Sequence, residues 1–134
     1  PFLPTFDAPD ATTTCTRRSR SNTPLQALTL ANDKAFFEMA QGIALRILTR
    51  APSPDHDRLR FGFRTCLARE PSTEELATLA NFLANQRMRF RDSDQDARAV
   101  APARRPVGVN AAEAAAWTAV ARVLVNLDEF ITRE

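Results

Sequence analysis

The sequence predicts an all-α protein, a five-helix orthogonal or bundle-like domain with an extended N-terminal arm. Its 134 residues are enough for one domain with its own core. Only three glycines, no tyrosine and few β-branched runs favour helices over sheet. Apolar residues recur at helical spacing between proline and capping signals. We expect an arm over 1–21, four helices within 22–91, a flexible connection over 92–109 and a C-terminal helix over 110–134.

The arm is rich in proline, threonine and arginine and has no apolar periodicity, which predicts an extended or irregular segment. Phe2, Leu3 and Phe6 are costly to leave in water, so we expect them to anchor the arm against a surface.

The first helix is expected to open at Pro24, which suits the first helical position. Thr23 is a good N-cap, and Gln26 three residues later completes a capping box. Asn32-Asp33 interrupts this helix and starts the second, which runs to about Thr49. The apolar stripe of the second helix is Phe36, Ala40, Ile43 and Ile47, with Phe37, Ala44 and Leu48 beside it.

The third helix is predicted to begin with Ser53 as the cap and Pro54 in the first turn. Asp55 and Asp57 favour the positive end of the helix. Pro71 ends this segment. The side chains expected to face inward are Leu59, Phe63, Cys66 and Leu67.

Ser72 and Glu75 form a second capping box, which starts the fourth helix. Its core stripe is Leu76, Leu79, Ala80 and Leu83, extending to Phe90.

The stretch 92–109 loses the periodicity, and we therefore expect a mobile polar connection there. Asn110 and Glu113 make a third capping box before the last helix. We expect this helix to be the most buried element, packed among the other four, with the stripe Trp117, Val120, Ala121, Leu124, Leu127 and Ile131.

The charge is nearly balanced, at +2, and Lys34 is the only lysine. An arginine-rich composition fits either a phosphate-binding surface or a coding bias towards arginine and alanine, and the sixteen acids favour the second interpretation. No segment reaches the roughly 20 apolar residues of a membrane span. The opening "PFLPTF" lacks an initiator methionine and is typical of the interior of a protein, so we interpret the chain as a fragment. The absence of a visible signal peptide therefore says little about where the parent protein is located.

Cys15 and Cys66 belong to no C-x-x-C or C-x-x-C-H motif, which argues against covalent haem and against a four-ligand zinc site. A disulfide between them and two unpaired, buried thiols both remain open. His56 is the only histidine, and its neighbours Asp55 and Asp57 point in other directions on a helix, so no metal site is expected. Haem bound by His56 with a methionine, Met39 or Met88, is not expected either.

The sequence evidence for a catalytic acid–base pair is also weak. Glu74 with Glu75, and Asp128 with Glu129, are interpreted as helix-cap acids and a solvated face rather than acid–base pairs. There is no glycine-rich phosphate loop. In "RMRFR", Phe90 could stack on a base, but a helix with one buried edge explains the pattern as well, and we expect no nucleic acid.

A family resemblance rests on three sets of residues. The first is Phe6-Asp7-x-Pro9, Cys15, Arg18, Ser21, Thr23-Pro24-x-Gln26-Ala27-Leu28 and Asn32-Asp33. The second is "CLAREPSTEEL" at 66–76, and the third is "AAWTAVARVLVNLDEFITRE" at 115–134. In this order they resemble the C-terminal part of a planctomycete-specific domain of unknown function that is found with planctomycete cytochrome c domains. Only 92–109 lacks a match.

The resemblance implies large, exported, multi-domain parent proteins at the periplasm or cell surface, often with a C-x-x-C-H haem site towards the N-terminus. That site is not in this chain, so no cofactor is expected here. The family motif includes a cysteine at the place of Cys15. Cys66 stands where an apolar residue is expected, which weakens the case for a disulfide. The family offers no catalytic residues to transfer.

We therefore expect a non-catalytic C-terminal helical module that docks on the N-terminal remainder of the same protein. One alternative is that Asp7 or Arg18 contributes to an active site completed by that remainder. The other is a nucleic-acid-binding helical domain. The candidate docking residues are Phe6, Asp7, Pro9, Cys15, Arg18, Ser21, Thr23, Pro24, Gln26, Asn32 and Asp33.

Overall fold

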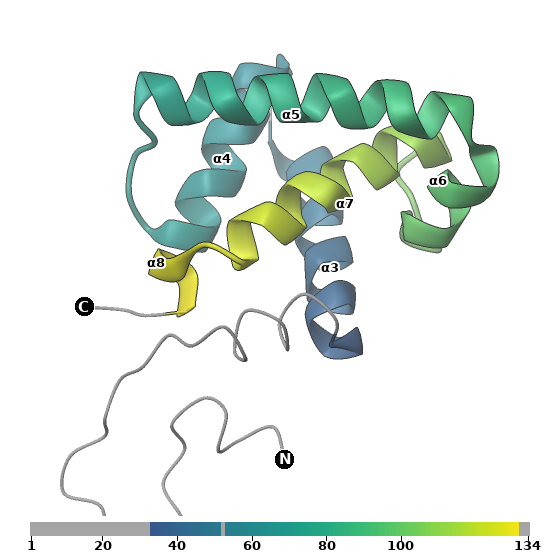
Figure 1. Ribbon diagram of the computed structural model, residues 1–134, viewed down its shortest axis with the longest axis horizontal. Coiled ribbons are helices and arrows are strands. Elements are labelled where there is room, and N and C mark those ends of the chain that lie inside the picture. Colours follow the sequence, from purple (N-terminus) through teal and green to yellow (C-terminus); the bar gives the residue numbers. More distant parts are fainter. Residues whose placement is uncertain (1–32, 52, 132–134) are drawn as a thin grey trace, which may run out of the picture.

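The computed structural model describes residues 33–51 and 53–131, and within these ranges every regular element is a helix (Figure 1). This confirms the predicted all-α class for the described part of the chain. The predicted arm and the predicted first helix lie outside the described residues. The helices are α3 (Lys34–Arg50), α4 (Asp55–Leu67), α5 (Thr73–Asp92), α6 (Asp94–Val100), α7 (Ala111–Val125) and α8 (Asp128–Ile131).

Capping side chains fix where α3 and α5 begin. Asp33 accepts a hydrogen bond from the backbone N–H of Ala35 at 2.7 Å. At α5 the predicted capping box is confirmed: the Ser72 hydroxyl accepts from the N–H of Glu75 at 3.1 Å, and the Glu75 carboxylate accepts from the N–H of Ser72 at 2.7 Å. These bonds satisfy backbone donors that the first turn of a helix leaves unpaired.

The expected cap of α4 was wrong. Pro54, not Ser53, occupies the N-cap position, and no side chain caps this helix. Asp55 and Asp57 do lie in the first turn, as predicted. A cis peptide bond joins Ser53 and Pro54.

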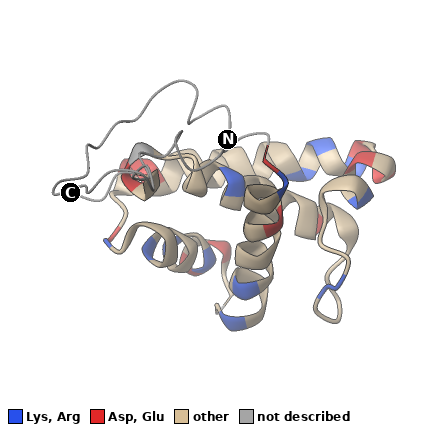
Figure 2. Ribbon diagram, turned by 90° about the horizontal axis from the view of Figure 1, so that it is seen from below, with Lys and Arg blue, Asp and Glu red and all other residues tan. Residues whose placement is uncertain are grey.

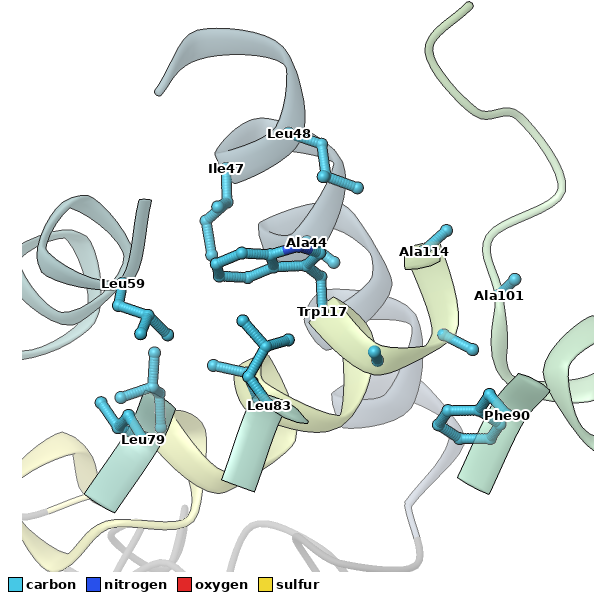
Figure 3. Close-up of a cluster of buried hydrophobic side chains, with 14 of the residues drawn as sticks. Ala44, Ile47, Leu48, Leu59, Leu79, Leu83, Phe90, Ala101, Ala114 and Trp117 are labelled. Carbon is cyan, nitrogen blue, oxygen red and sulfur yellow. The ribbon is translucent and has the colours of Figure 1, made fainter. Parts of the chain in front are cut away.

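Helix α7 is the centre of the molecule, as expected. It runs obliquely beneath α5 and contacts α3, α4, α5, α6 and α8 (Figure 1). The indole of Trp117 is fully buried and lies between Ile47 of α3 and Leu83 of α5 (Figure 3). The buried residues of α7 are Ala111, Ala114, Ala115, Ala116, Trp117, Thr118, Val120, Ala121, Leu124 and Val125.

The expected irregular connection over 92–109 contains a helix, α6, and that part of the prediction was wrong. Ser93 starts α6 by accepting a hydrogen bond from the N–H of Asp96 at 3.3 Å. Ala97 is the buried residue of this short helix and joins the main core cluster. Val100, at the end of α6, is partly buried and also packs against this cluster. Two such contacts give no clear apolar period in the sequence.

The C-terminal helix was predicted as one element but is two. The N–H of Asn126 donates to the carbonyls of Arg122 at 3.2 Å and of Val123 at 3.1 Å, so the last turn of α7 tightens and ends. After Leu127 the chain resumes as the four-residue α8. Leu127 and Ile131, which were expected in the buried stripe, are only half-buried.

Candidate functional site

A cluster of charged side chains joins three helices. Arg87, in the C-terminal half of α5, donates to Asp55 at the start of α4 and to Glu113 at the start of α7. Its Nη2 lies 3.0 Å from Asp55 Oδ1, and its Nε lies 2.8 Å from Glu113 Oε2. Each carboxylate is held by two donors of the same guanidinium, the fork geometry that makes arginine pairs strong.

Glu113 has a second partner, the indole of Trp117. The Nε1 of Trp117 donates to Glu113 Oε1 at 2.9 Å. Asn110 caps α7 by accepting from the N–H of Glu113 at 2.8 Å, as expected. The other half of the expected third capping box was wrong, because the Glu113 carboxylate turns to Arg87 and Trp117. An ion pair and a buried indole compete better for this carboxylate than a backbone N–H does.

The charges of the cluster are fixed by their neighbours. Hydrogen bonds from Arg87 hold the pKa of Asp55 below its ordinary value. Burial raises the pKa of Glu113, but bonds from Arg87 and Trp117 outweigh it and leave this pKa lowered. The same bonds to Asp55 and Glu113 raise the pKa of Arg87. All three groups therefore stay charged near neutral pH, and none is poised to exchange a proton as an acid or base would.

An apolar groove runs between α4 and α5 and ends at this cluster. It encloses about 460 Å³. Leu76 is half-buried in it, and the small side chains of Ala77, Ala80 and Ala84 are exposed along its α5 wall. The expectation that Ala80 lies in the core was therefore wrong. The lining residues are Asp55, His56, Leu59, Thr73, Leu76, Ala77, Ala80, Leu83, Ala84 and Arg87.

A second charged cluster ties α8 to the turn between α4 and α5. Arg69 donates to Glu75 at 2.7 and 3.0 Å and to Glu129 at 2.7 and 2.8 Å. Its guanidinium also lies 4.8 Å from the ring centre of Phe63. Glu75 is thus both a cap and an ion-pair partner, and Glu129 is paired rather than merely solvated.

Ten of the eleven candidate docking residues lie outside the described residues, and their predicted role stays a prediction. The remaining one, Asp33, caps α3. The ten are Phe6, Asp7, Pro9, Cys15, Arg18, Ser21, Thr23, Pro24, Gln26 and Asn32.

Among the described residues, His56 was considered as a metal or haem ligand and Cys66 as a thiol. His56 Nδ1 lies 3.5 Å from Asp57 Oδ1, while Asp55 is engaged with Arg87. Within 33–51 and 53–131, no three residues among His, Cys, Asp and Glu gather closely enough to hold a metal ion. Cys66 is a free, buried thiol, and burial raises its pKa to about 11, which makes it a poor nucleophile. Cys15, the other cysteine of the disulfide that the sequence left open, lies outside the described residues.

Phe90 is not available to stack on a base. Its side chain is buried in the main core cluster, with Arg89 5.5 Å from its ring centre. This is the buried-edge arrangement that was one of the two interpretations of "RMRFR". None of the helices in the described part of the chain has the length and apolarity that crossing a membrane requires.

Sequence reasoning did not find Arg87 or its pairing with Glu113. Asp55 and Glu113 were identified only as acids at helix starts, and their shared partner lies 32 and 26 residues away in the sequence. The available signal was an arginine on the inward side of α5, level with the core positions Leu83 and Phe90. A long cation at such a position needs an anionic partner when it is largely buried.

The family model PSD1, described as a protein of unknown function (DUF1553), matches residues 1–83. No curated protein matches the chain. No solved structure matches it either.

Proposed function

The chain belongs to the PSD1 family of unknown function (DUF1553), and we propose that it acts as a non-catalytic helical docking module of a larger protein. Another part of the same parent protein would bind this module along the α4–α5 groove. The observation that carries the proposal is this groove, an exposed apolar surface between two helices that the core holds in place.

The groove suits docking because of its lining. The exposed side chains of its α5 wall are small, and small side chains let another backbone approach closely. Thr73 and Arg87 mark the two ends of this wall, which are about 21 Å apart at the rise of an α-helix. A surface of this length matches several turns of a bound helix or an extended peptide.

The charged clusters support a structural role over a catalytic one. Arg87 and Arg69 each form ion pairs with two carboxylates, and all four of these carboxylates have lowered pKa values. A catalytic acid or base needs a pKa near the working pH and access to a substrate atom. The clusters instead hold helix starts and the C-terminal α8 against the body of the molecule.

We further propose, from the resemblance noted in the sequence, that the parent is an exported planctomycete protein associated with a cytochrome c domain. The haem would then belong to a domain outside this chain, and the module would be a support for it.

Co-purification tests both parts of this proposal. The chain is expressed with a tag, the remainder of its parent protein is expressed separately, and the two are mixed. We expect a stable complex in gel filtration with a haem absorbance band. Absence of a complex would overturn docking. A complex without a haem band would overturn only the cytochrome c association.

A further inference from the structure

The sequence has several stretches without acids, and two of them meet in the fold. Residues 39–54 and 97–112 contain no Asp or Glu, although the whole chain has sixteen. The first stretch carries Arg46 and Arg50, and the second carries Arg98, Arg104 and Arg105, as the printed sequence shows.

The fold brings these two stretches together. The side-chain amide of Gln41 donates to the carbonyls of Val100 at 3.0 Å and Ala101 at 3.3 Å, which joins α3 to the end of α6. In Figure 2 the C-terminal end of α3 and the loop between α6 and α7 project to the same side of the molecule. Both carry blue segments and no red ones there.

Four of these arginines are exposed and have no carboxylate partner among the ion pairs of the described residues: Arg46, Arg50, Arg104 and Arg105. Arg105 donates to the carbonyl of Pro102 at 3.3 Å, which neutralises no charge. By contrast, Arg60, Arg64, Arg69, Arg87 and Arg98 are all paired with acids.

An apolar side chain stands beside the loop arginines. Val107 is fully exposed at the tip of a tight turn, in which the N–H of Val109 donates to the carbonyl of Pro106 at 3.1 Å. Gly108 supplies the positive φ of 84° that this turn requires. The turn therefore presents Val107 outward instead of folding it against the core.

We propose that Arg46, Arg50, Arg104, Arg105 and Val107 form a docking surface, the basic edge, for an acidic protein segment that carries carboxylates around an apolar side chain. Charge complementarity is the argument, because four unneutralised guanidinium groups favour an anionic partner and speed its encounter. This surface is separate from the α4–α5 groove, so the inference does not depend on the groove's occupant.

The composition of the basic edge favours a protein over a phosphate partner. Residues 39–54 and 97–112 include no aromatic residue, and sequence-tolerant binding of single-stranded nucleic acid relies on aromatic stacking. One exposed valine has too little apolar area to anchor the molecule on a lipid surface. Arginine beside an apolar contact is typical of protein interfaces.

The test is fluorescence anisotropy of a labelled acidic peptide, for example about four repeats of Glu-Glu-Leu-Ser, titrated with the whole chain at low salt, where screening is weak. We expect binding that weakens as salt is added. The double variant Arg46→Gln, Arg104→Gln should bind about fivefold more weakly, the sum of two exposed charge contacts. The matched control is Arg89→Gln, Arg91→Gln, which removes the same charge from α5 and should change the affinity less than about twofold.

Three results would overturn the proposal. The first is no binding of the peptide. The second is an equal loss in both double variants, which would mean attraction to the total charge and no defined surface. The third is tighter, Arg46- and Arg104-dependent binding of a single-stranded oligonucleotide or of vesicles with phosphatidylserine, which would assign a phosphate partner. Circular dichroism shows whether each variant keeps its helices.

Discussion

Arg87 connects three helices that are far apart in the sequence through the hydrogen bonds of a single guanidinium. Its side chain is 24% exposed, and that of Glu113 is 27% exposed, so both charges have lost much of their contact with water. Breaking such a pair by removing one partner leaves the other charge poorly solvated. Arg87 therefore holds the start of α4 and the start of α7 together.

Replacing Arg87 with Met tests this dependence. We expect the free energy of unfolding to fall by about 2 kcal/mol, because Glu113 and Asp55 lose their common partner while the apolar stem is kept. The measurement is urea denaturation followed by circular dichroism. Arg91→Met on the same helix, where the side chain is exposed, should change stability by less than about 0.5 kcal/mol. Equal effects of the two changes would contradict the role of the cluster.

The stability of the chain should fall in acid, partly through Glu75. Hydrogen bonds from Arg69 and from the backbone of Ser72 lower the pKa of Glu75 from 4.5 to about 2. Because the pKa of Glu75 is lower in the folded state, its charged carboxylate stabilises the fold above pH 4.5. This contribution to stability is lost as the pH falls towards 2.

Glu75→Gln should therefore lower Tm at pH 5 and flatten its fall between pH 5 and about 2.5. The measurement is a series of thermal melts over that range. Glu74→Gln, in the same turn, is the matched control, and its Tm should fall with pH as steeply as that of the unsubstituted chain. If the Tm of Glu75→Gln also fell as steeply, Glu75 would not be coupled to folding in this way.

At the scale of elements, the helices with a long apolar stripe were predicted well, and the short or interrupted ones were not. α3, α4 and α5 begin within a residue or two of the proline and capping signals. α6 was missed because seven mostly polar residues show no period, although Ser93 followed by acids was a usable start signal. α7 ends at the hydrogen bonds of the Asn126 N–H, and α8 beyond it is held by Arg69, a contact across 60 residues that local patterns do not encode.

The two helical glycines of α3 and α4 should respond differently to alanine. A Cβ at Gly42 would meet no atom within 4 Å, so Gly42→Ala should stabilise α3 by about 0.7 kcal/mol through helix propensity. A Cβ at Gly62 would lie 2.7 Å from Ile47 Cδ1, where α4 packs against α3.

Ile47 is 1% exposed and has little room to turn, so Gly62→Ala should be less stable than Gly42→Ala by at least about 1 kcal/mol. Chemical denaturation of both variants gives the comparison. A Gly62→Ala chain as stable as Gly42→Ala would show that the contact between α3 and α4 is looser than described.

At the scale of the whole molecule, the residues that match the family model do not include the most buried part of the core. The match covers 1–83 and ends within α5, whereas the most buried helix is α7. α3 and α5 both pack on α7, so the matched region needs this later helix to bury its apolar faces. The burial of the C-terminal helix could be predicted from its stripe, but the pairing of charges across the core could not, because each pair joins residues that only the fold brings together.

A chain that ends at residue 110 should therefore lose cooperative thermal unfolding, since the packing of α3, α5 and α6 on α7 is removed. A chain that ends at residue 127 loses only α8 and its pairing with Arg69, and should keep a cooperative transition at a lower Tm. Differential scanning calorimetry distinguishes the two. A cooperative transition in the shorter chain would contradict the central place of α7.

The central claim, docking along the α4–α5 groove, is tested most directly by the affinity of the chain for the remainder of its parent protein, with and without a blocked groove. Ala80→Arg places a long charged side chain on the exposed α5 wall, and Ala99→Arg makes the same change at an exposed site of α6 outside the groove. Titration calorimetry should show at least about tenfold weaker binding for Ala80→Arg and unchanged binding for Ala99→Arg. Equal affinities of the two variants would contradict the claim.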